Sequence, residues 1–528
     1  MSTRVAPDEN GHDDVKRQKT NGHTDTHASN VNGNGDGTKS RIILYAFMMG
    51  CSGHQSPGLW THGADRSRHH NKLSYWTDHA KLLERGKFDG LFLADVLGGY
   101  DVYNGNLDAA LRSGAQFPVI DPLLLVSAMA GVTRHLSFGL TATTSYVHPY
   151  ELARRFSTLD HITNGRVGWN VVTGYLDSAA RQFGNKNQDL HAVRYQVAHE
   201  YMDVVYKLWE SSWADDSVHH NAQHQLYTDP ERVRKINHTG KYFDSVPGPH
   251  ICEPSPQRTP VIYQAGSSGP GMEFAAKHAE VIFIAAHKPS VAKKRVDAAR
   301  AGAEKAGRDP ASLKVLALLC PIVGATEEEA QAKYEEHLAH GSDDGALALF
   351  GGWTGIDLSG YADDEELRIV ESNAIKSAVE NFAAQDPNVP KWTKKAVADK
   401  IKLGGLGPTI VGTPESIADQ LESWIQESGV DGFNLAYTLA PGTFEDFIDH
   451  VLPILQQRGR VWNDYPAPLP SQPTTDPSQG PPSGFGVDEQ ASLTSREKLY
   501  GLGQTKLRPD HYASKFTWKA GQPAPPLD

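Results

Sequence analysis

The sequence predicts an α/β protein built on a (β/α)8 TIM barrel, with insertions and an extended C-terminal tail. From about residue 41 to residue 460, short β-rich apolar runs alternate with longer amphipathic segments, which is the order of strands and helices in α/β folds. An open, doubly wound sheet shows the same alternation, but the eight strand-like runs in this chain fit a closed barrel better. The length of 528 residues agrees, because barrels with insertions exceed the usual domain size as one unit.

Each element is predicted from its hydrophobic period and its flanking residues. One helix, for example, has Asp121 at its cap and Pro122 in its first position, a combination typical of helix starts. The predicted strands cover 42–48, 91–94, 136–141, 167–172, 260–265, 281–285, 313–323 and 432–436. The predicted helices cover 75–87, 122–132, 150–162, 194–210, 290–306, 326–339, 414–428 and 443–457.

Composition divides the chain into three parts. Residues 1–39 are rich in Asn, Gly, Asp and His with few apolar side chains, which predicts a disordered tail. The barrel domain is expected over 40–460, with insertions near 212–258 and 341–408 that are too long for ordinary loops and are expected over the barrel mouth. Residues 461–528 are rich in Pro, Ser and Gly at first, and we expect a tail that packs on the body or on a neighbouring subunit of a homo-oligomer.

Charge and cysteine content limit the possible partners and the compartment. The net charge of −12, from 51 Lys plus Arg against 63 Asp plus Glu, disfavours nucleic acid. No apolar stretch is long enough to span a bilayer and no signal-like segment opens the chain, so no membrane partner is expected. The three cysteines, Cys51, Cys252 and Cys320, are widely spaced, which is typical of reduced thiols in a cytoplasmic protein.

Polar residues at the predicted strand ends are the first candidates for a site, since TIM-barrel active sites form at the carboxyl ends of the strands. Asp95 ends the second strand, Thr143 follows the third, Asn170 and Thr173 belong to the fourth, and Ser267 and Ser268 follow the fifth. Asp95 could equally be a helix cap, and Asn170 could merely satisfy a loop backbone. No protein group is assigned as a catalytic acid or base.

The segment after the fifth strand, Gly266 to Gly271, is rich in Ser and Gly and precedes a helix expected near Met272. Free backbone N–H groups at such a helix start can bind a phosphate, although the glycines could also serve only to make a tight turn. His191 and Tyr195 are four residues apart and so share a helix face, either as part of a site or as a packed aromatic cluster.

Other kinds of site find no support in the sequence. The histidines lack the His-Glu-x-x-His spacing, so no metal site is predicted. There is no Gly-x-Ser-x-Gly nucleophile motif, and no Gly-x-Gly-x-x-Gly follows the first strand, so neither a hydrolase elbow nor a tightly held dinucleotide is expected.

Four long strings resemble the luciferase-like flavin monooxygenases, in particular the nitrilotriacetate and dibenzothiophene-sulfone monooxygenase group. They are LLERGKFDGLFLAD at 82–95, HPYELARRFSTLDHITNGRVGWNVVT at 148–173, YMDVVYKLWE at 201–210 and EPSPQRTPVIYQAGSSGPG at 253–271. The resemblance runs from about residue 41 into the C-terminal tail. It implies a TIM barrel that binds FMN, takes reduced FMN from a separate NAD(P)H-dependent flavin reductase, and uses O2 to oxygenate a small organic substrate.

The resemblance also implies which residues contact the flavin. Carried over by position, they are Asp95, Thr143, Asn170, His191, Tyr195 and Ser267, with Ser268 near the phosphate. The loop at 98–118 and the insertion at 341–408 have no conspicuous cluster of Arg or Lys, which disfavours a polyanionic substrate and favours a neutral organosulfur compound or hydrocarbon. Two alternatives stay open, a deazaflavin-dependent oxidoreductase on the same barrel and a non-catalytic flavin-binding protein.

Overall fold

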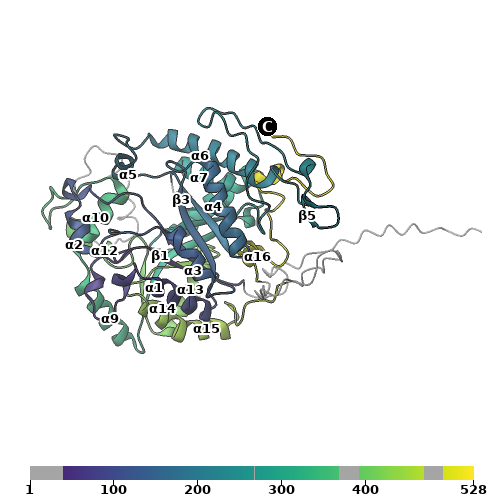
Figure 1. Ribbon diagram of the computed structural model, residues 1–528. Coiled ribbons are helices and arrows are strands. Elements are labelled where there is room, and N and C mark those ends of the chain that lie inside the picture. Colours follow the sequence, from purple (N-terminus) through teal and green to yellow (C-terminus); the bar gives the residue numbers. More distant parts are fainter. Residues whose placement is uncertain (1–39, 267, 368–391, 469–491, 528) are drawn as a thin grey trace, which may run out of the picture.

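The computed structural model describes residues 40–266, 268–367, 392–468 and 492–527, so the predicted disordered tail at 1–39 lies outside the described residues. Within them, eight parallel strands close into a barrel surrounded by helices (Figure 1). The barrel strands are β1 (Ile43–Met49), β2 (Gly90–Ala94), β3 (Ser137–Thr143), β4 (Val167–Val172), β7 (Val261–Gln264), β8 (Val281–Ile284), β9 (Lys314–Val323) and β11 (Gly432–Leu435). Pairing of β8 with β9, and of β11 with both β9 and β1, completes the ring. The predicted TIM barrel is confirmed.

Alternation along each strand sends one set of side chains outward and the other into the barrel. On β1, Leu44 and Ala46 belong to the large core between strands and helices, whereas Tyr45 belongs to a separate cluster inside the barrel. The Tyr45 hydroxyl lies 2.8 Å from the Tyr263 hydroxyl, and the Phe92 ring packs edge-on against Tyr263. The middle of the barrel is therefore a filled aromatic core, and any space for a ligand lies nearer its ends.

The described helices follow the predicted alternation closely. They are α1 (Leu73–Arg85), α2 (Asp108–Ser113), α3 (Val126–Ala130), α4 (Pro149–Ile162), α5 (Asp177–Gln182), α6 (His191–Tyr206), α7 (Gly269–His278), α8 (Pro289–Lys305), α9 (Glu327–His340), α10 (Asp343–Thr354), α12 (Lys394–Ile401), α13 (Pro414–Ser428), α14 (Gly442–Asp446), α15 (Leu452–Gln457) and α16 (Ser495–Tyr500). Several boundaries differ from the prediction by a few residues. The helix expected at 122–132 begins as a 3-10 turn at Pro122–Leu125, and α6 begins at His191 rather than 194. No described helix is long and apolar enough to cross a membrane.

The described part of the 341–408 insertion lies at the carboxyl end of the barrel strands. It contributes α10 and α12, and the strand that follows it, β10 (Thr409–Gly412), pairs with the end of β9. A second hydrophobic cluster joins these helices to α2 and α5, both of which follow barrel strands. Figure 1 shows α2, α10 and α12 together on one side of the barrel. The described part of this insertion therefore packs against the loops that follow β2 and β4.

The 212–258 insertion does not cover the mouth, and that prediction was wrong. It connects the end of the α6 region to the start of β7 and contains a small hairpin of β5 (Val218–Asn221) and β6 (Leu226–Thr228). Its Arg232 and Arg234 donate hydrogen bonds to tail carbonyls of Gln522 and Pro525. Because a helix-to-strand connection reaches the amino end of the next strand, the hairpin side of this insertion lies by the tail, away from the mouth. Its Tyr242 and Phe243 instead run along the outside of α6 and contact Gln196 and His148.

The C-terminal tail closes the amino end of the barrel. Leu499 of α16 packs with Val261 and Val281, the first residues of β7 and β8. The neighbouring Lys498 donates hydrogen bonds to the Asp89 carbonyl at 3.2 Å and to the Ser137 hydroxyl at 2.9 Å. A tail helix thus supplies an apolar side chain to the barrel floor, together with a buried amino group whose pKa burial lowers to about 7.

A buried ion pair fixes α16 to the barrel. Arg496 donates to both carboxylate oxygens of Glu280, at 2.7 and 3.0 Å, and to the Thr259 carbonyl at 2.9 Å. The two charged side chains are 0% and 3% exposed. Burial alone would raise the pKa of Glu280, but the Arg496 guanidinium holds the pKa below its usual value. Bidentate geometry of this kind is the strongest arrangement available to a buried charge pair.

We predict that Arg496→Met will strongly destabilise the protein, because it leaves the buried Glu280 carboxylate without its partner. The expected loss of unfolding free energy is about 3 to 5 kcal/mol, measured by denaturant unfolding. The matched control is Arg508→Met, since Arg508 is 30% exposed where it pairs with Asp309 and should contribute about 1 kcal/mol or less. Equal losses in the two variants would contradict the special role of the buried pair.

Candidate functional site

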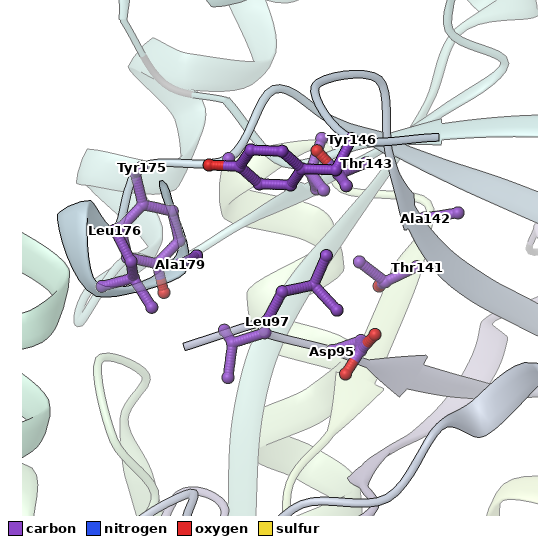
Figure 2. Close-up of a pocket in the computed structure, with 12 residues that line it drawn as sticks. Asp95, Leu97, Thr141, Ala142, Thr143, Tyr146, Tyr175, Leu176 and Ala179 are labelled. Carbon is purple, nitrogen blue, oxygen red and sulfur yellow. The ribbon is translucent and has the colours of Figure 1, made fainter. Parts of the chain in front are cut away.

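A pocket opens at the carboxyl end of the barrel strands, the end at which TIM-barrel active sites form. Its lining residues come from the ends of β2, β3 and β4 and from the loops after them: Asp95, Val96, Leu97, Thr141, Ala142, Thr143, Tyr146, Val172, Gly174, Tyr175, Leu176 and Ala179. Figure 2 shows Asp95 and Thr141 at one end of the pocket and Tyr175, Leu176 and Ala179 at the other. We call this space the inner pocket.

Asp95 is the acidic group of the inner pocket. Burial, reinforced by the nearby charge of Asp121, raises the pKa of Asp95 to about 7, while a hydrogen bond from the Val96 backbone opposes the shift. Near neutral pH the carboxyl group is therefore present both in its charged form and in its protonated form, which can donate a hydrogen bond as well as accept one. A carboxylic acid of this kind suits a polar heterocycle better than it suits a cation.

Asn170 lies inside the same end of the barrel. Its side-chain Nδ2 donates to the Thr141 hydroxyl at 3.0 Å, and Thr141 lines the inner pocket. Its Oδ1 is buried and has no hydrogen-bond partner among the described residues. Since a buried acceptor without a partner is costly, the site is built to receive a donor from a ligand.

The rim of the inner pocket is formed by two loops that are hydrogen-bonded to each other. The Ser145 backbone N–H donates to the Thr143 hydroxyl at 3.1 Å, and the Ser145 hydroxyl donates to the Thr173 carbonyl at 2.6 Å. Tyr146 in turn donates to the Gln188 side chain at 3.2 Å. Thr143 therefore faces the pocket, whereas Thr173 contributes its backbone carbonyl to the rim.

His191, Tyr195 and Ser268 meet at the amino end of α7. The Ser268 hydroxyl accepts a hydrogen bond from the Gly271 backbone and lies 3.1 Å from Nε2 of His191, whose ring centre is 5.0 Å from that of Tyr195. A Cβ at Gly266 would lie 2.3 Å from the Gln264 side-chain amide and 2.7 Å from the Tyr195 hydroxyl, so a larger residue would force these side chains to shift. Hydroxyl and imidazole groups beside a helix amino end form a suitable seat for a phosphate.

The structure thus brings seven of the eight predicted site residues to two neighbouring places. Asp95, Thr143, Asn170 and Thr173 surround the inner pocket, and His191, Tyr195 and Ser268 surround the end of α7. Ser267 lies outside the described residues. Sequence reasoning missed the pocket walls formed by Leu97, Tyr146, Tyr175 and Leu176, because they belong to irregular loops whose path has no periodic signal.

The described residues contain no group of three or more His, Cys, Asp or Glu that could hold a metal ion. The arrangement instead offers a carboxyl group with a raised pKa and an unpartnered amide oxygen beside apolar walls. These groups would suit the donor and acceptor edge of a flavin ring, and the groups at the amino end of α7 would suit the phosphate of FMN.

Comparisons with known proteins agree with this description. Residues 49–432 match the family model of the luciferase-like monooxygenases. The dimethyl-sulfide monooxygenase of Hyphomicrobium sulfonivorans is 50% identical over 81% of this chain and 88% of its own length, and the long-chain alkane monooxygenase of Geobacillus thermodenitrificans is 46% identical over 90% and 98%. A crystal structure of riboflavin lyase with modified FMN and riboflavin covers 90% of this chain and all of its own, at 32% identity and a TM-score of 0.78.

The chain belongs to the luciferase-like monooxygenase family. It is therefore a monooxygenase, and the family uses reduced flavin and O2.

We predict that the affinity for FMN falls as the pH rises through about 7, because Asp95 loses its proton and its charge then opposes the anionic cofactor. Above the pKa of Asp95 the carboxylate can no longer donate a hydrogen bond, so the Kd should rise about fivefold to tenfold between pH 6 and pH 8. Titrating FMN fluorescence across this range measures the effect. Asp95→Asn keeps the shape of the side chain but cannot titrate, so its Kd for FMN should change little with pH. The same pH dependence of the Kd in both proteins would contradict the assignment of the titration to Asp95.

We predict that Ser268→Asp weakens FMN binding by about 1 to 3 kcal/mol, because it places a negative charge where the phosphate should lie. The matched control is Ser268→Asn, since Asp and Asn cap a helix equally well but only Asp is charged. Measuring the Kd for FMN and the Kd for riboflavin, which lacks the phosphate, separates repulsion of the phosphate from a general disturbance of the site. An equal change for both ligands would mean that the phosphate lies elsewhere.

Proposed function

We propose that the protein is a two-component FMN-dependent monooxygenase. It takes reduced FMN from a separate NAD(P)H-dependent flavin reductase and uses O2 to oxygenate a small, neutral organosulfur compound or hydrocarbon. The observation that carries the proposal is the pairing of Asp95, whose pKa is raised to about 7, and the unpartnered Asn170 amide oxygen with an apolar pocket at the barrel mouth. Family membership supplies the reaction class.

Individual residues have defined parts in this proposal. Asp95 and Asn170 would hydrogen-bond to the polar edge of the flavin ring, with Thr143 beside them. His191, Tyr195 and Ser268, with Ser267 from the same turn, would hold the phosphate. Bound reduced FMN supplies two electrons and two protons, so that one atom of O2 enters the substrate and the other leaves as water. The apolar walls exclude water from the reacting atoms.

Supply of reduced FMN by a separate protein follows from the sequence. No Gly-x-Gly-x-x-Gly follows the first strand, so the chain offers no recognised seat for a nicotinamide dinucleotide beside the flavin. Reduction must then occur on another protein. We propose that both work in the cytoplasm, because the three cysteines are free thiols, as is usual in a reducing compartment. We also propose that the protein forms a homo-oligomer.

The lining of the inner pocket supports a neutral substrate. Its members include no Lys or Arg, so a polyanion such as an aminopolycarboxylate would find no counter-charge there. The substrates named for the two relatives, dimethyl sulfide and long-chain alkanes, are also neutral and apolar. They differ greatly in length, so similarity to these relatives leaves the size of the substrate open.

Two alternatives make different predictions for cofactor binding and turnover. A deazaflavin-dependent oxidoreductase would bind the deazaflavin cofactor tightly and FMN weakly, and equilibrium titration with both separates it from the proposal. A non-catalytic flavin-binding protein would bind FMN but give no product. We favour the leading proposal over both alternatives, because the two relatives described above are named monooxygenases.

We predict that the purified protein, supplied with FMN and a generic flavin reductase under 18O2, will place one 18O atom in a dialkyl sulfide or alkane. Mass spectrometry of the product measures the incorporation, and omission of the reductase should abolish it. Asn170→Leu, which removes the amide while keeping the size, should reduce both FMN affinity and product. Product without 18O, or reductase-dependent peroxide alone across the whole substrate panel, would contradict the proposed function.

A further inference from the structure

A second space lies beside the inner pocket and further from the barrel strands. This outer chamber is open to solvent and is lined by Asp101, Val102, Gly105, Tyr175, Leu176, Asp177, Arg181, Gly352, Trp353, Thr354 and Gly355. Its walls come from the loop after β2, from the start of α5, and from the end of α10. The outer chamber is therefore built by the loops and by the 341–408 insertion, not by the barrel.

Two residues separate the chambers. Tyr175 and Leu176 line both the inner pocket and the outer chamber, and no other residue does so among those described. Figure 2 shows the two side chains at the end of the inner pocket away from Asp95. The Tyr175 side chain is 47% exposed, so much of its surface meets space and not packed protein. Together they form a wall one side chain thick.

Hydrogen bonds hold this wall in place. The Tyr175 hydroxyl lies 2.9 Å from the Tyr100 hydroxyl, which in turn receives a hydrogen bond from Trp353 Nε1 at 3.2 Å and donates to Gln116 at 2.7 Å. The wall is thereby tied at its polar tip to the loop after β2 and to α10. A side chain fixed in this way can set the size of a pocket.

The helix behind the wall is fixed as well. Ser178 donates to the Gly99 carbonyl at 2.7 Å, and Arg181 forms an ion pair with Asp101. A Cβ at Gly98 would lie 2.4 Å from the Ala179 backbone nitrogen, so α5 and this loop are in direct backbone contact. The wall therefore cannot move away without breaking several contacts of α5.

The two chambers differ in chemistry. The inner pocket is apolar apart from the polar end at Asp95, whereas the outer chamber contains Asp101, Asp177 and Arg181. A substrate whose reacting atom lies near Asp95 would meet Tyr175 and Leu176 as its chain grows. We propose that Tyr175 and Leu176 form a wall that limits substrate length, so that short apolar substrates fit and longer ones need the outer chamber. This inference rests on the proposed function for the location of the reacting atom.

The test uses the FMN-loaded full chain and a series of methyl alkyl sulfides with one arm from one to ten carbons. Calorimetric binding of the series measures pocket size without turnover. In the wild type, each methylene should tighten binding about fourfold until the arm reaches the wall, after which affinity should fall at least tenfold. In Tyr175→Ala and Leu176→Ala, the longest tolerated arm should increase by two or more carbons.

Two control variants test whether the bulk of the Tyr175 side chain causes the length limit. Tyr175→Phe keeps the ring and should keep the length limit, since bulk and not the hydroxyl makes the wall. Tyr227→Ala makes the same chemical change as Tyr175→Ala on β6, where the side chain is 67% exposed, and should leave the limit unchanged. FMN affinity near the wild-type value in each variant shows that the site is intact.

The outcomes separate this inference from the proposed function. Length limits that move in Tyr175→Ala or Leu176→Ala, but not in the controls, support the wall, and they do so even if no sulfide is oxidised. No length limit in the wild type, or the same limit in all variants, overturns it. Turnover of these sulfides with 18O incorporation but without a shift in the limit would leave the proposed function standing and the wall refuted.

Discussion

Parallel closure of the sheet is the constraint on which the rest of the structure depends. Because every barrel strand runs in the same direction, every carboxyl end opens at one mouth. Residues that are far apart in sequence are thereby brought together: Asp95 and Asn170 are 75 positions apart and meet around one pocket through Thr141. The site is a consequence of topology, and no local motif could have produced it.

A barrel that opens at one end must be closed at the other, and here the C-terminal tail closes it. The aromatic layer around Tyr45 and Tyr263 fills the middle, and Leu499 completes the floor below. Leu499 belongs to α16, which is held in place by the buried pair of Arg496 and Glu280. Either charge would be costly to bury without the other. The tail is thus part of the barrel's core, although its composition resembles that of a linker.

The sequence alone could predict those parts that follow a period or a motif. The eight strands and most helices appear within a few residues of their predicted places, because burial on a barrel imposes a regular pattern. The location of the 212–258 insertion could not be read correctly, since composition does not show at which end of the barrel a loop emerges. The Tyr175 and Leu176 wall was missed for a related reason: its partners, Tyr100 and Trp353, come from separate loops.

Strands and loops contribute to the site in different ways. The polar groups suited to a flavin come mainly from strand ends and the ends of two helices, which the closed barrel holds rigidly. The apolar walls come from loops, and these same walls raise the pKa of Asp95 by removing water from around it. A change in the loops would therefore alter the shape of the substrate space and also the protonation of the carboxyl group. Substrate range and cofactor chemistry are therefore coupled, because the loops that shape the substrate space also exclude water from around Asp95. The coupling holds although loops supply the apolar walls and strand ends supply the polar groups.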